Sequence, residues 1–146
     1  MLTRITIRNL VIVRELDLAL GTGMSALTGE TGAGKSILVD ALGLALGGKA
    51  DSGQIRHGAD RAEVCATFDI DGHAAATAWL RDHDMDADGE CLLRRVIIRG
   101  GRSRAYINGS PVTQSLLRTF GEQLIDIHSQ HAHQSLLKAD VQRELL

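Results

Sequence analysis

The chain contains the stretch Gly29-Glu30-Thr31-Gly32-Ala33-Gly34-Lys35-Ser36, which matches Gly-x-x-x-x-Gly-Lys-Ser/Thr at every fixed position. This spacing is typical of a loop whose backbone N–H groups surround phosphate oxygens, with the lysine at the β- and γ-phosphates and the hydroxyl on Mg²⁺. The glycines let the backbone wrap the phosphates where a Cβ would clash. The stretch therefore predicts a nucleotide-phosphate site.

The residues on either side of the loop predict a strand before it and a helix after it. Residues 24–28 form a short, largely apolar run that follows a glycine turn. Apolar residues after Ser36 recur at three- and four-residue steps up to Leu46, and Gly47-Gly48 predicts the helix end. The loop then lies at a helix N-terminus, which favours an anion. A plain glycine-rich turn with a solvated Lys35 is the alternative interpretation.

The composition is that of a globular chain. Of 146 residues, 44% are apolar and 23% are charged, and the formal net charge of −2 excludes a polycation that would coat nucleic acid non-specifically. No apolar run approaches the length of a membrane span, and no signal-peptide pattern is present. Cys65 and Cys91 fall in predicted strands without a C-x-x-C motif, so we expect free core thiols and a cytoplasmic protein.

Alternating apolar residues predict antiparallel strands on both sides of the loop unit, at 4–8, 15–20, 63–70, 91–99, 102–107 and 124–128. Short helices are predicted at 74–81 and 113–120, and Gly100-Gly101 is predicted as a two-residue hairpin turn. This order predicts a mixed α/β layer fold and argues against the repeated βαβ units of a doubly wound GTPase or small kinase. Residues 140–146 predict a helix that stops in its second turn, so we expect a longer polypeptide.

Segments spread over almost the whole chain carry a family resemblance: Leu2–Asn9, Ile12–Leu16, Thr28–Ser36, Asp40–Leu44, Cys91–Ile97, Gly101–Arg104, Ile107–Gly109 and Ile127–Gln134. They resemble the N-terminal part of the RecN family of bacterial DNA-repair proteins, relatives of the structural-maintenance-of-chromosomes (SMC) ATPases within the ABC ATPase class. The resemblance implies an α/β P-loop NTPase fold, as the N-terminal half of an ABC/SMC-type ATPase head with antiparallel strands beside the P-loop strand and helix. Residues 1–146 would be its N-terminal lobe, and the coiled coil and C-terminal lobe would lie elsewhere.

The resemblance also implies roles for single residues. Gln130 would be the Q-loop glutamine, a ligand of Mg²⁺ with Ser36 and a catalytic residue with Lys35; a solvated loop residue is the alternative. Ile37 follows the metal ligand where ABC ATPases often carry Ser or Thr, so only its backbone N–H could serve the nucleotide. Arg56 stands where related heads place a basic loop near the nucleotide, and an exposed loop arginine is the alternative.

The implied function is the ATP-binding half of an SMC-like ATPase in DNA double-strand-break repair and recombination, within the SOS response to DNA damage. ATP and Mg²⁺ would be the cofactors, a second copy of the head would complete an ATP-dependent dimer, and the full-length protein would meet DNA at the nucleoid. The sequence contains no signature motif and no Asp-Glu pair after an apolar strand, so hydrolysis would need a C-terminal lobe. A nucleotide-sensing module that binds ATP without hydrolysis is the alternative, and a small kinase is disfavoured.

Three other features have plainer interpretations. The histidines His128, His131 and His133 lack a coherent set of zinc ligands. Residues 84–89 start like a calcium loop, but an arginine stands at the twelfth position, so an acidic turn is predicted. The hairpin arginines could meet DNA phosphates, but a solvated hairpin face explains them too; they are Arg94, Arg95, Arg99, Arg102 and Arg104.

Overall fold

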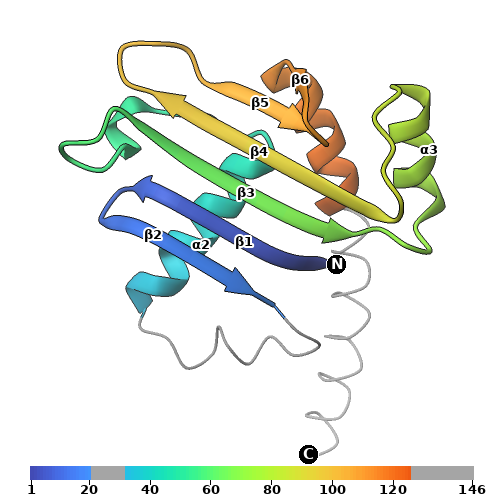
Figure 1. Cartoon of the computed structure of the whole chain (residues 1–146), viewed down its shortest axis with the longest axis horizontal. Coiled ribbons are helices and arrows are strands. Elements are labelled where there is room, and N and C mark those ends of the chain that lie inside the picture. The colour runs from blue at the N-terminus through green and yellow to red at the C-terminus, as the bar shows by residue number, and fades with distance from the viewer. Residues whose placement is uncertain (21–31, 126–146) are drawn as a thin grey trace, which may run out of the picture.

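The computed structural model describes residues 1–20 and 32–125, and only the backbone of residues 32–35. Within these ranges six strands form one antiparallel sheet in the order β2-β1-β3-β4-β5-β6 (Figure 1). The strands are β1 (Leu2–Leu10), β2 (Val13–Ala19), β3 (Arg61–Asp69), β4 (Glu90–Ile98), β5 (Arg104–Ile107) and β6 (Ser110–Val112). The helices are α2 (Gly32–Ala45), α3 (Ala74–Asp82), the short 3-10 helix η1 (Ser52–Gln54) and a helix at 114–125, called helix 114–125 below.

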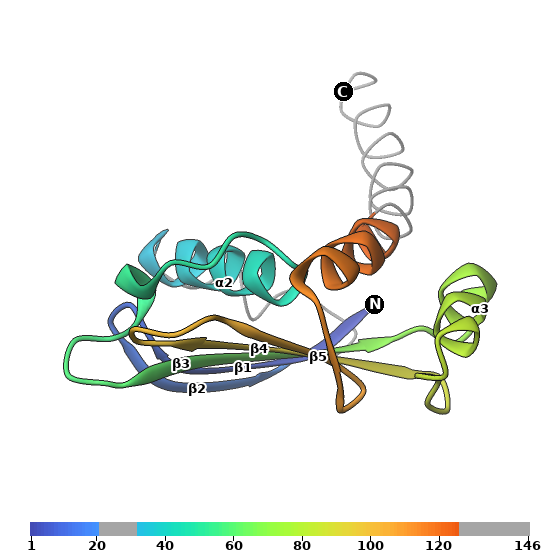
Figure 2. The ribbon, with the colours of Figure 1, turned by 90° about the horizontal axis from the view of Figure 1, so that it is seen from above.

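The described elements form two layers, with the sheet below and the helices above it (Figure 2). Helices α2 and 114–125 cover the same sheet face, and α3 stands at the end where β3 leaves the sheet and β4 enters it. Side chains alternate along the strands: Ile5 and Ile7 of β1 and Val64 of β3 are at most 2% exposed. The core therefore lies between one sheet face and the helices, where Leu117 and Phe120 are fully buried.

The opposite sheet face is polar, and several of its charges are paired. The register brings Thr6, Cys65, Arg94 and Tyr106 next to one another across four strands. The Arg94 guanidinium is hydrogen-bonded to the Glu63 carboxylate, and it lies 4.9 Å from the centre of the Tyr106 ring. This face has the pattern of a solvated sheet surface.

The predicted strands at 4–8, 15–20 and 63–70 and the helices at 74–81 and 113–120 are confirmed. Thr113 caps the second of these helices, because its Oγ1 accepts a hydrogen bond from the Leu116 N–H at 3.1 Å. The strand predicted at 124–128 is wrong for its first two residues, which continue helix 114–125. Leu117, Phe120 and Leu124 are all buried at helical spacing, and packing of that stripe decides the conformation.

The β4–β5 connection is longer than the predicted two-residue turn. Gly101 N–H donates to Ile98 O at 3.1 Å and Gly100 has φ +72°, but β5 begins only at Arg104. The tight two-residue turn lies one connection later, at Asn108 (φ 49°) and Gly109 (φ 84°), where it joins β5 to β6.

Several predictions fall outside the described residues. They are the strand at 24–28, the loop residues Gly29, Glu30 and Thr31, the Q-loop residue Gln130, the three histidines and the helix at 140–146. Among the helices described, none combines the length and the apolar character that crossing a membrane requires.

Candidate functional site

The first turn of α2 contains the described part of the phosphate loop. The helix begins at Gly32, so Gly32, Ala33, Gly34 and Lys35 form this turn, and it contains no acidic residue. A lysine here adds positive charge where the free N–H groups already make the helix end positive. The arrangement is unfavourable by itself, and an anion at this end relieves it.

The two residues after the turn differ in exposure. Ser36 is exposed, so its hydroxyl is accessible to a metal ion, and hydroxyl oxygen is a hard ligand that suits Mg²⁺. Ile37 is half-buried and packs against the core, so it offers no side-chain oxygen to a nucleotide. The roles predicted for these two residues stay predictions.

The C-terminal half of α2 holds the helix on the sheet. Ala41 and Ala45 are fully buried and Leu44 is 3% exposed, whereas Val39 at the middle of the helix is 68% exposed. The helix ends in a Schellman motif: Gly47 has φ +96°, its N–H donates to Leu44 O, and Gly48 N–H donates to Gly43 O at 2.9 Å.

Arg95 does not belong to the exposed arginines with which the sequence analysis grouped it. It is 1% exposed, and its Nη1 donates to Leu44 O at 3.0 Å and to Gly48 O at 2.8 Å. Arg94, the next residue along β4, faces the opposite side of the sheet because strand side chains alternate. Arg95 is therefore excluded from the candidate DNA contacts, and Arg102 and Arg104 remain exposed.

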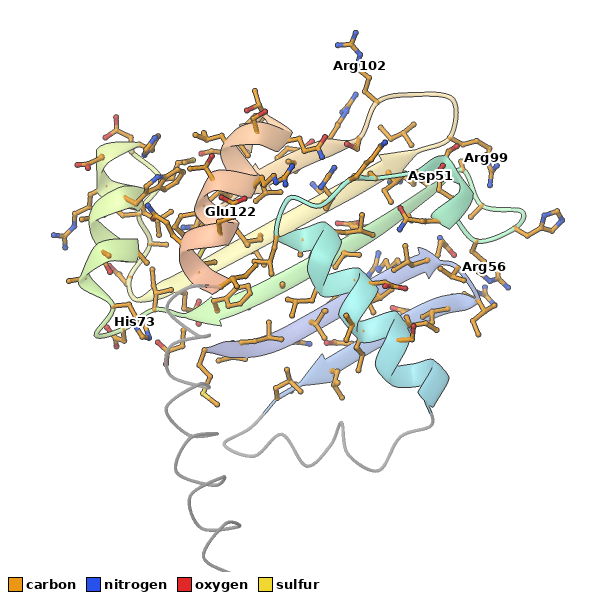
Figure 3. The ribbon with its side chains drawn as sticks, turned by 180° about the vertical axis from the view of Figure 1, so that it is seen from behind. Asp51, Arg56, His73, Arg99, Arg102 and Glu122 are labelled. Atoms are coloured by element: carbon orange, nitrogen blue, oxygen red, sulfur yellow. The ribbon has the colours of Figure 1, made fainter. Side chains whose placement is uncertain are left out.

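Arg56 lies at the end of the molecule where α2 begins (Figure 3). Two backbone hydrogen bonds fasten its segment to the β1–β2 turn: Arg56 N–H donates to Asn9 O at 2.8 Å, and Val11 N–H donates to Gln54 O at 2.7 Å. The preceding η1 is capped by Asp51, whose Oδ1 accepts from Gly53 N–H at 3.0 Å. The fold thus brings the half-buried Arg56 to the end of the molecule at which α2 begins (Figure 3), and its role near a nucleotide stays a prediction.

An apolar groove of about 290 Å³ opens between α2, helix 114–125 and the sheet. Leu2, Leu42, Phe68 and Ile125 are among the side chains that line it. Met1 and Ile125 at the groove are each 47% exposed. No pattern in the sequence indicates this groove, because its walls come from segments far apart in the chain.

The two cysteines are free, as predicted. Burial is the largest cause of the shift at both, and it raises the pKa of Cys65 to about 11 and that of Cys91 to about 12. Because both pKa values lie well above 7, neither cysteine supplies a thiolate for chemistry at neutral pH. Among the described residues no group of three or more His, Cys, Asp or Glu side chains could hold a metal ion.

Comparison with known sequences gives a consistent result. The AAA_23 family of AAA domains matches residues 4–145. DNA repair protein RecN of Vibrio cholerae is 51% identical over 146 residues, which is 100% of this chain and 26% of the relative. The RecN proteins of Haemophilus influenzae and Bacillus subtilis are 48% and 37% identical, again over 100% of this chain and 27% and 26% of theirs. The chain thus spans about a quarter of the length of these curated relatives.

Solved structures give the same fold. A structure described under ATP-driven dimerization and DNA-stimulated activation of SMC ATPases matches with a TM-score of 0.66 at 22% identity, over 83% of this chain and 79% of that one. The SMC head domain of Thermotoga maritima matches with a TM-score of 0.56 at 22% identity, over 81% of this chain and 41% of that one. The recombination mediator RecF matches with a TM-score of 0.56 at 16% identity, over 80% and 29%. The fold is that of the N-terminal half of an SMC/ABC-type P-loop NTPase.

Proposed function

Since this chain belongs to the AAA_23 family of AAA domains and corresponds to the N-terminal part of RecN, we propose that it is the ATP-binding half of a DNA-repair ATPase head. One observation carries the proposal: the first turn of α2 has no acidic residue, includes Lys35, and is followed by an exposed Ser36. A triphosphate complements each of these features.

In the proposed site, Gly29, Glu30, Thr31, Gly32, Ala33 and Gly34 supply backbone N–H groups to the phosphates, and Lys35 supplies a point charge. Ile37 contributes its backbone N–H, and Arg56 approaches from the segment fastened to the β1–β2 turn. Ser36 and Gln130 would hold Mg²⁺, which neutralises phosphate charge when it is bound. The protein thus acts mainly by positioning and by electrostatics, with Lys35 and Gln130 as its catalytic residues on this chain.

Hydrolysis in this proposal needs parts of the protein beyond residue 146. The relatives continue for about three times the length of this chain, since it covers 26% of the Vibrio cholerae protein. The apolar groove and the exposed side of α2 at Val39 are the surfaces on which a C-terminal lobe of the same polypeptide would pack. A second head would complete the site in an ATP-dependent dimer, and the assembled protein would act on DNA in the cytoplasm, at the nucleoid.

The test measures binding and turnover of ATP by the full-length protein and by its Lys35→Ala variant. We expect the wild type to bind an ATP analogue in the presence of Mg²⁺ and to hydrolyse ATP, and the variant to lose both. The residues 1–146 by themselves should show negligible turnover. Unchanged turnover in the variant would contradict the assignment, and binding without turnover by the full-length wild type would favour a nucleotide-sensing module instead.

A further inference from the structure

One buried arginine connects three separate parts of the fold. Arg95 on β4 bonds through Nη1 to Leu44 O and Gly48 O at the end of α2, and through Nη2 to Ser103 Oγ in the β4–β5 loop at 3.1 Å. Within the described residues, Arg95 is the one charged or polar side chain in the buried class. Its position on a strand ties α2 directly to the middle of the sheet.

The positive charge of Arg95 is compensated by backbone carbonyl groups and not by a carboxylate of the described residues. No carboxylate pairs with it in the described part of the chain, and its Nε has no hydrogen-bond partner there. Burying a guanidinium without a counter-charge costs several kcal/mol. The compensation comes from carbonyl groups at the C-terminal end of α2, where the helix dipole is negative. Desolvation lowers the pKa of Arg95.

Each carbonyl that Arg95 holds has one further hydrogen-bond partner: Leu44 O also accepts from the Gly47 N–H at 3.1 Å, and Gly48 O accepts from Gln114. Gln114 Nε2 reaches Gly47 O at 3.4 Å and Gly48 O at 3.3 Å, both at the long end of hydrogen-bond distances, and Gln114 is exposed. The bond from Arg95 to Gly48 O is 2.8 Å and comes from a charged donor, which makes it the stronger of the two attachments.

The attachment lies at the end of α2 that is packed, far from the end that would meet phosphate. Among residues 36–45, whose side chains the structure describes, the buried residues of α2 are Ala41, Leu44 and Ala45 near its C-terminal end, while Ser36 and Val39 nearer the start are exposed. A helix of 14 residues is about 21 Å long and moves as a rod. A change of tilt at the fastened end therefore displaces the first turn.

We propose that Arg95 is a positioning residue for the phosphate-binding turn: by holding the C-terminal carbonyls of α2, it sets where Lys35 and Ser36 lie relative to the nucleotide. The inference rests on the proposed function, because it assumes that the first turn binds ATP. Arg95 itself contacts no substrate in this proposal. Ser103 lies in the β4–β5 loop and not at the helix, so its bond can be removed by mutation while the two bonds from the guanidinium to the carbonyls of Leu44 and Gly48 stay in place.

The experiment uses the full-length protein and four variants. Arg95→Met keeps the side-chain volume and removes every donor, Arg95→Lys keeps the charge with a single donor group, and Ser103→Ala removes only the loop bond. Lys35→Ala tests the proposed function. For each protein the affinity for a fluorescent ATP analogue with Mg²⁺, the urea midpoint and the deuterium uptake of residues 32–40 are measured.

We expect Arg95→Met to weaken nucleotide binding about tenfold, because small misplacements of binding groups have effects of this size. Arg95→Lys should recover part of that loss, and Ser103→Ala should bind within about twofold of wild type. Deuterium uptake of residues 32–40 should be highest in the variants with the lowest affinity. These results would support positioning, because a merely structural role would lower the urea midpoint without this order of affinities.

Two results would overturn the inference while leaving the ATP site in place: folded Arg95 variants that bind like wild type, or a Ser103→Ala variant that loses as much affinity as Arg95→Met. If Arg95→Met does not fold, Arg95→Lys decides, and unchanged affinity with unchanged uptake at 32–40 overturns the inference. Lys35→Ala binding like wild type, or wild type failing to bind, would refute the proposed function, and the inference with it.

Discussion

Gly121 is the point where helix 114–125 touches the end of α2, and its replacement by alanine should destabilise the fold. A Cβ at this position would lie 2.3 Å from Leu46 O, 3.0 Å from Leu46 C and 3.1 Å from Leu46 Cα. These are backbone atoms that cannot rotate away, so the two helices must separate by about 1 Å, which forfeits a quarter to a half of the contact energy between the atoms affected. Overpacking of this kind costs about 1–3 kcal/mol, and the better helix propensity of alanine returns about 1 kcal/mol.

The matched control is Gly43→Ala in α2, because a Cβ there meets nothing within 4 Å. Both positions are helical, so the propensity gain is common to both variants and only the contact differs. Urea unfolding of the 146-residue chain, followed by far-UV circular dichroism, should show a midpoint for Gly121→Ala about 0.5–1.5 M below that of Gly43→Ala, whose own midpoint should lie slightly above wild type. A Gly121→Ala midpoint equal to or above that of Gly43→Ala would refute the reasoning.

Three further predictions concern other parts of the described chain. Burial would raise the pKa of Glu63, but the hydrogen bond and charge of Arg94 outweigh it and hold the pKa below the ordinary 4.5, so the unfolded chain takes up its proton first as pH falls. Urea midpoints should therefore drop below about pH 4.5 less steeply for Glu63→Gln than for wild type, and equal slopes would contradict this. The raised thiol pKa values, about 11 for Cys65 and about 12 for Cys91, should make alkylation by iodoacetamide at pH 8 at least about 100-fold slower in the folded chain than in urea; comparable rates would show accessible thiolates. Val11 is 44% exposed with φ 53°, a conformation that asparagine adopts more readily than valine. Val11→Asn should therefore increase the free energy of unfolding by up to about 1 kcal/mol and raise the urea midpoint. A lowered midpoint would argue against backbone strain at this turn.

The strands in which polar and apolar residues alternate were predictable from the sequence, whereas the side chains of β4 that point inward were not. Strict alternation in β1 and β3 marks one polar and one apolar side, and both strands form where predicted. In β4 the alternation breaks after Arg94, because Arg95, Val96 and Ile97 are all buried. A pattern of that kind cannot tell which of two neighbouring arginines points inward, so Arg95 was grouped with the surface arginines.

Some turns and helix ends were also predictable from the sequence, and others were not. The Thr113 cap and the paired glycines after α2 act through local chemistry, and α2 ends at these glycines as predicted. The turn at Val11 has no such signal in the sequence, because β-branched residues rarely adopt positive φ. Two hydrogen bonds with the segment at 54–56 hold this turn in place. At the candidate site, the roles of Ser36 and Ile37 stay predictions, whereas the apolar groove depends on contacts that only the folded chain creates.

The pairing of β1 with β3 has a consequence for how this chain folds. Ile7 lies opposite Val64 and Leu2 opposite Phe68, so this pairing closes a loop of more than fifty residues that includes all of α2. The hairpins β1–β2 and β5–β6 need only short closures and should form in microseconds, whereas the long closure carries a larger entropic cost. During synthesis α2 emerges before either β3 or β4, so its apolar side waits for the sheet face that covers it. Stopped-flow refolding should therefore show the helix buried only in the slow phase, together with the joining of β1 to β3.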